Sequence, residues 1–114
     1  MNSIKNQVQL IGHLGQNPEL KTFDNEKKMV RFSLATNEVY KDQAGEKKQI
    51  TQWHTVIAWG KLAENINTMA EKGTEMAVQG KLTYREYTDS EGVKKYFTEV
   101  VAQEFFKIGS ASNN

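Results

Sequence analysis

Four aromatic residues interrupt the polar, strand-like segments of this 114-residue chain, and each has basic residues close by in the sequence. The four are Tyr40, Trp53, Trp59 and Tyr87. Flat rings can stack on nucleobases, while lysine and arginine side chains can meet phosphates. Because every base has a π-face, such a surface can hold an unpaired strand without reading its sequence. The pattern therefore predicts binding of single-stranded nucleic acid.

The alternative for Trp53 and Trp59 is a place in the hydrophobic core, since aromatic residues favour strands in general. The two residues lie on one face of a predicted strand, roughly 20 Å apart at ~3.3 Å per residue. Thr55 between them is polar, whereas the opposite face of the strand is apolar. This alternation favours a surface position for both rings. Tyr40 and Tyr87 lie where strands meet loops, and a core position is less expected there.

The net charge is only +1, from 15 basic and 14 acidic residues, so the position of the charges matters more than their sum. Arg31 alternates along its strand with residues expected in the core, so its side chain faces outward. It could contact phosphate, and the alternative is a solvated surface arginine without a binding role. The acidic residues Glu64, Glu71 and Glu75 belong to or flank a helical segment, and we expect them to lie away from the basic loops. The lysines beside these loops are Lys27, Lys28, Lys41, Lys47 and Lys48.

Several other functions find no support in the sequence. The absence of cysteine excludes a disulfide framework and thiolate metal sites. His13 and His54 lack the spacing of a metal site. Gly60-Lys61 is no phosphate-binding loop, because Thr55 stands where that loop needs its first glycine. We therefore expect neither an enzyme nor a cofactor. Without an apolar run of about 18 residues or a secretory leader, a cytoplasmic protein with no membrane contact is expected. The predicted nucleic-acid binding would make it nucleoid-associated.

The periodicity predicts one domain that consists of three strands, one helix and two strands. The strands are expected over 6–14, 30–37, 50–59, 76–84 and 96–108, with a helix over 62–70 and a disordered polar tail over 109–114. A helix between the third and fourth of five strands is the element order of the OB-fold, a Greek-key barrel that binds oligonucleotides. We therefore predict an all-β OB-fold domain over 1–108, a five-stranded antiparallel barrel with one helix. A β-sandwich could share the same element order.

Several segments resemble the bacterial single-stranded DNA-binding protein family. The matching segments run in order from about residue 5 to 108 and include 12–20, 32–37, 51–54, 59–64, 88–92 and 98–100. The resemblance implies an OB-fold and a homo-oligomer, usually a tetramer. It also implies binding of single-stranded DNA without sequence preference in replication, recombination and repair. The best-known members end in an acidic peptide that docks replication proteins, and this chain has no acidic residue after Glu104. Docking through the tail is therefore doubtful, whether the chain is trimmed or a short member.

The resemblance also assigns roles to individual residues. Tyr40, Trp53, Trp59 and Tyr87 fall where the family places its base-stacking rings. The basic residues near the implied DNA path are Lys41, Lys61, Lys72 and Arg85, and Arg31 joins them as a predicted phosphate contact. Other positions that can be basic in the family are occupied here by Gln7, Thr83 and Glu86, which would lower affinity and its salt dependence.

A subunit interface is predicted at the first strand. Val8, Leu10 and Ile11 place apolar side chains on both faces of this strand, so it can pair with its copy across a dimer axis. The family resemblance places His54 near a subunit contact. Two other functions stay open: an RNA-preferring OB module like the cold-shock domains, and a primosome-type adaptor that acts through protein contacts.

Overall fold

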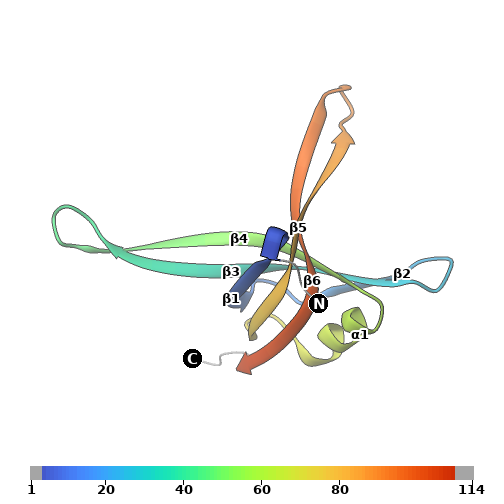
Figure 1. The fold of residues 1–114 in the computed structure, drawn as a ribbon, viewed down its shortest axis with the longest axis horizontal. Helices are drawn as coiled ribbons and strands as arrows, with labels where there is room; N and C mark the ends of the chain where they lie inside the picture. Colours follow the sequence, from blue (N-terminus) through green and yellow to red (C-terminus); the bar gives the residue numbers. More distant parts are fainter. Residues whose placement is uncertain (1–3, 110–114) are drawn as a thin grey trace.

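A computed structural model describes residues 4–109 as strands around one short helix, with three hairpins that extend outward (Figure 1). A 3-10 turn, η1, precedes the first strand. The elements are η1 Ile4–Asn6, β1 Val8–Leu14, β2 Glu19–Thr22, β3 Lys28–Lys41, β4 Lys47–Trp59, α1 Gly60–Met69, β5 Glu75–Thr88 and β6 Lys94–Gly109.

Five of the strands close into a barrel. Their order is β1-β5-β6-β4-β3, and pairing of β1 with β3 completes the ring, while β2 lies outside it along the free side of β3. The predicted OB-fold barrel is confirmed, with α1 between its third and fourth strands. One detail of the prediction is wrong, because β4 and β6 are parallel, through the pairs Val56↔Val100 and Ile57↔Val101. Directions cannot alternate all the way around a ring with an odd number of strands, so one neighbouring pair must be parallel.

The core lies inside this ring, and the alternation of apolar and polar residues along β3 determines which side chains enter it. Val30, Phe32 and Leu34 are buried on the inner face. From α1, Ala63 and Ile66 pack into the same cluster, so the helix covers one end of the barrel. Burial of such apolar side chains is the main source of stability for a domain of this size.

The hairpin turns at the ends of the β3–β4 and β5–β6 ribbons have the same hydrogen-bond pattern. Asp42 accepts hydrogen bonds through Oδ1 from the N–H groups of Ala44 and Glu46, at 2.9 and 3.0 Å. Asp89 does the same at the other turn. The fourth residue of each turn is a glycine with a φ of +81°. The β2–β3 turn differs, because Glu26 adopts a φ of +64° there, where glycine is favoured.

Three differences from the sequence predictions concern element boundaries. The first strand begins at Val8 and not at residue 6, because η1 precedes it. The strand β2 was not predicted, since its four residues are all exposed and leave no alternation to detect. Gly109 closes β6, and the remainder of the predicted disordered tail, 110–114, lies outside the described residues.

Candidate nucleic-acid interface

The outer face of the β3–β4 ribbon carries the first group of predicted binding residues. Antiparallel partners share a face, and Ala35 pairs with Trp53, Ser33 with Thr55, and Arg31 with Ile57. Because the alternate residues of β3 fill the core, these pairs point outward. They form a surface with an exposed indole at one end and a guanidinium at the other, although Ala35 and Ile57 within it are themselves buried.

The same surface continues across the parallel seam onto β6 and β5. Phe97 and Glu99 alternate with inward-facing residues of β6, and their partners on β5 are Arg85 and Thr83. Two residues beyond Arg85, Tyr87 pairs with Lys95 and keeps this orientation. Arg31, Trp53, Arg85 and Tyr87 therefore belong to one outer face, although they come from three different strands.

A buried carboxylate holds the two arginines on this face. Only 4% of the Glu99 side chain is exposed, and its Oε2 lies 3.2 Å from an Arg85 nitrogen and 3.6 Å from an Arg31 nitrogen. The Arg85 guanidinium also lies over the Phe97 ring, 5.5 Å from its centroid. Both arginine side chains keep part of their surface exposed, so they are fixed in place and still accessible to an anion. The three charges sum to +1.

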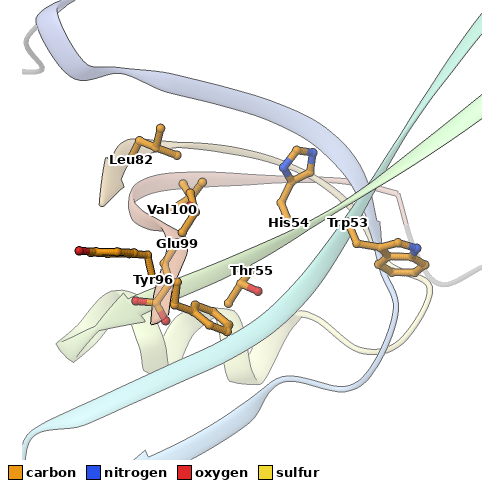
Figure 2. Close-up of a pocket in the computed structure, with 9 residues that line it drawn as sticks. Trp53, His54, Thr55, Leu82, Tyr96, Glu99 and Val100 are labelled. Carbon is orange, nitrogen blue, oxygen red and sulfur yellow. The ribbon is translucent and has the colours of Figure 1, made fainter. Parts of the chain in front are cut away.

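A pocket of about 250 Å³ opens beside this cluster, where β4 and the β5–β6 ribbon separate. Figure 2 shows Trp53 and Tyr96 at opposite ends of it, with Thr55 and Glu99 between them. His54 also lines this pocket, and its Nε2 lies 2.9 Å from the Thr36 hydroxyl. Its role at a subunit interface stays a prediction.

Trp59 lies at the other end of β4, within a second cluster. The Phe23 ring stacks on it, with centroids 6.0 Å apart and planes inclined by 29°. Lys27 places Nζ 5.8 Å from the centroid of the Trp59 ring. Sequence reasoning missed Phe23 and named Lys27 only among the lysines beside the loops, because the strand that brings both residues to Trp59 was not recognised.

The expectation that helical acids lie away from the basic loops is wrong for Glu64. Its Oε1 is 3.3 Å from Nζ of Lys28. The reason is that α1 begins directly after Trp59, so its first turns pass the start of β3. Lys61 lies in the first turn of α1, two residues after Trp59.

Two basic residues of the prediction remain, and the first of them, Lys72, lies beside the turn between β1 and β2. Its N–H donates to Oδ1 of Asn17 at 2.7 Å, which joins it to the turn between β1 and β2. Gly15 of that turn approaches Trp53 so closely that an added Cβ would lie 2.5 Å from the indole. Lys72 and Trp53 therefore contact the same turn, although they come from distant parts of the sequence.

Tyr40 and Lys41 occupy the outer end of the β3–β4 ribbon, far along it from the barrel (Figure 1). Tyr40 pairs with Lys48, and its parity places it on the face of the ribbon opposite to Trp53. The structure therefore does not bring Tyr40 onto the outer face that Trp53 and Arg31 share.

All four predicted stacking rings are exposed. The exposed fractions are 46% for Tyr40, 62% for Trp53, 42% for Trp59 and 45% for Tyr87. The core alternative is thus excluded for them, and their contact with nucleic acid stays a prediction. Within residues 4–109 no cluster of His, Asp and Glu has the arrangement of a metal site. None of the helices in that range has the length and hydrophobicity that a membrane crossing requires.

Residues 5–108 match the Single-strand binding protein family. The chain belongs to the single-strand binding protein family. Among relatives of the family, single-stranded DNA-binding protein 1 of Chlorobaculum tepidum is 40% identical over 106 residues, which are 92% of this chain and 65% of the relative. Single-stranded DNA-binding protein 1 of Xylella fastidiosa is 38% identical over 110 residues, 96% of this chain and 81% of the relative. The chain thus spans about two thirds of the first relative's length.

Solved structures of single-strand binding proteins share the fold. A Plasmodium falciparum SSB, in complex with ssDNA, superposes with a TM-score of 0.83 at 30% identity and covers 95% of this chain and 99% of its own. A deletion mutant of the single-stranded DNA binding protein from Thermus aquaticus superposes with a TM-score of 0.79 at 29% identity. That match covers 90% of this chain and 50% of the Thermus chain.

Proposed function

We propose that this protein binds single-stranded DNA without sequence preference. One observation carries the proposal: Trp53, Tyr87, Arg31 and Arg85 share one outer face of an OB-fold barrel. Exposed rings supply stacking surfaces that accept any base, and the arginines supply charge for phosphates. Family membership and the ssDNA complex of a structural relative support the same ligand.

In this proposal the strand crosses β4, β6 and β5, and the hairpin ribbons extend its path. Trp53 and Tyr87 stack bases on the barrel face and at the base of the β5–β6 ribbon. Trp59 and Tyr40 stack bases further along, Tyr40 from the opposite face of its ribbon. Phosphates meet Arg31 and Arg85 at the centre, and Lys41, Lys61 and Lys72 at the periphery. Each stacked base contributes about 1–3 kcal/mol, so several weak contacts add up to tight binding.

Tryptophan fluorescence tests this proposal, since both indoles are exposed and lie on the proposed path. Titration with oligo-dT at two salt concentrations should quench the emission, and a mixed-sequence oligonucleotide should bind with similar affinity. The logarithm of the binding constant should fall with the logarithm of salt concentration by about 0.7 for each phosphate contacted. Stronger binding of oligo-U would indicate the RNA-preferring module. Binding only in the presence of a protein partner would indicate the adaptor.

We also propose that the protein assembles as a homo-oligomer, most simply a tetramer. From Val8 to Gly12, β1 pairs only with β5, because its pairing with β3 is confined to His13 and Leu14. This leaves a strand edge free to pair with a second copy. Beside that edge, Ile11 and Phe106 are exposed in a single row across β1, β5 and β6. A row of exposed apolar side chains is typical of a protein interface.

Light scattering tests the assembly. The wild-type mass should be about four times the 13.0 kDa of one chain, and Ile11→Lys should lower it by placing charges in the interface. A monomeric wild-type protein would contradict the proposed assembly. Coating of exposed strands during replication, recombination and repair, within the nucleoid, is the cellular role that this binding would serve.

A further inference from the structure

Phe23 is an exposed aromatic ring whose position the core does not explain. It follows β2 directly, is 44% exposed, and does not belong to the cluster of buried side chains inside the barrel. Its ring contact is instead with Trp59 at the end of β4. The outer face described above therefore extends beyond Trp59 to Phe23.

The short strand β2 is what brings this ring into place. Lys21 pairs with Met29, and Met29 pairs with Trp59, so one outer face continues from β4 across β3 to β2. Phe23 has the parity of Lys21 and lies on this face. The β2–β3 turn then holds Phe23 through both of its backbone groups. The N–H of Phe23 donates to the carbonyl oxygen of Lys27 at 2.8 Å, and the N–H of Glu26 donates to the carbonyl oxygen of Phe23 at 2.8 Å.

A lysine stands next to the two rings with its charge available. Lys27 lies over the Trp59 ring, and no carboxylate within residues 4–109 forms an ion pair with it among the salt bridges of the structure. Its neighbour Lys28 is paired with Glu64. Lys27, Lys28 and Trp59 border one open pocket of about 390 Å³.

We propose that Phe23, Trp59 and Lys27 form an additional nucleotide subsite on the β2–β3 hairpin. A base stacks on the exposed surface of the Phe23–Trp59 pair, and Lys27 binds the adjoining phosphate. The base does not insert between the two rings: van der Waals contact on both of its faces needs about 7–8 Å, and the centroids are 6.0 Å apart. This inference rests on the proposed binding of single-stranded DNA and extends the path beyond Trp59.

Substitutions at Phe23 test the stacking, with fluorescence anisotropy of a labelled oligo-dT as the measurement. Phe23→Ala should weaken binding by about 5- to 150-fold, the usual effect of losing one stacked base. Phe23→Tyr keeps the ring and should bind like the wild type. Phe23→Leu keeps apolar bulk without a π-face and should behave like Phe23→Ala. Wild-type affinity in Phe23→Leu would overturn the stacking role.

Two adjacent lysines give a matched test of the phosphate contact. Lys27→Gln should reduce the salt slope of binding by about 0.7, the value for one phosphate on a single strand. Lys28→Gln removes the same charge one residue away and should leave the slope unchanged, since Lys28 is engaged by Glu64. Equal slopes in the two variants would overturn the inference, and this comparison decides the matter if Phe23→Leu proves unstable. A wild-type protein that does not bind oligo-dT would refute the proposed function itself.

Discussion

The buried carboxylate of Glu99 makes a quantitative prediction about the proposed interface. It neutralises one of the two guanidinium charges that Arg31 and Arg85 present on the outer face. Glu99→Gln keeps the size of the side chain and raises the local charge from +1 to +2. A strand bound there should then displace about one more counterion, so the salt slope should steepen by about 0.7.

This slope translates into a simple comparison of binding constants. Relative to the wild type, Glu99→Gln should gain affinity at low salt, and the gain should shrink roughly threefold between 50 and 200 mM salt. The free energy of unfolding should fall by only about 1–2 kcal/mol. A larger loss is expected when an unpaired charge stays buried, but 38% of the Arg31 side chain and 52% of the Arg85 side chain are exposed to water.

The assay is a titration with oligo-dT at four or more salt concentrations, together with urea denaturation. Glu104→Gln is the control, because it removes the same charge from β6 at an exposed position that forms no ion pair with either arginine. Its slope should match the wild type. An unchanged or shallower slope in Glu99→Gln would refute the idea that these arginines contact phosphates.

Three further substitutions have defined outcomes. Trp53→Ala should weaken oligo-dT binding by about 5- to 150-fold with little loss of stability, since the ring is mostly exposed, and unchanged affinity would remove it from the path. Glu26→Gly should raise the free energy of unfolding by about 0.5–1 kcal/mol in urea titrations by relieving a left-handed conformation, and a decrease would contradict this. Gly80→Ala would place Cβ 2.1 Å from the carbonyl oxygen of Val101, so calorimetry should show a melting temperature lower by several degrees, and an unchanged value would contradict the close approach.

Alternation along single strands made much of the fold predictable. Val30, Phe32 and Leu34 recur at every second position, so the inner face of β3 could be recognised without a structure. The polar Thr55 between Trp53 and Trp59 likewise indicated an outer face. These features are local, and they follow from the two-residue period of a strand.

Features that depend on pairing between distant segments could not be predicted in this way. The contact of Glu99 with Arg31 crosses a seam between strands far apart in the sequence. The position of Phe23 on Trp59 depends on β2, whose exposed residues show no periodicity. Tyr40 was expected to stack bases together with Trp53. It lies far along its ribbon and an odd number of residues from Ala35, the partner of Trp53, so it is on the other face of the ribbon.

The parallel seam between β4 and β6 has a mechanical consequence. It consists of two residue pairs, and beyond it the two long ribbons separate, each with its own ladder of hydrogen bonds. A tilt of one ribbon relative to the other would therefore break no main-chain hydrogen bond within either ribbon. A single strand of nucleic acid has an irregular backbone, and two ribbons whose separation adjusts could follow it while the β4–β6 pairs stay formed.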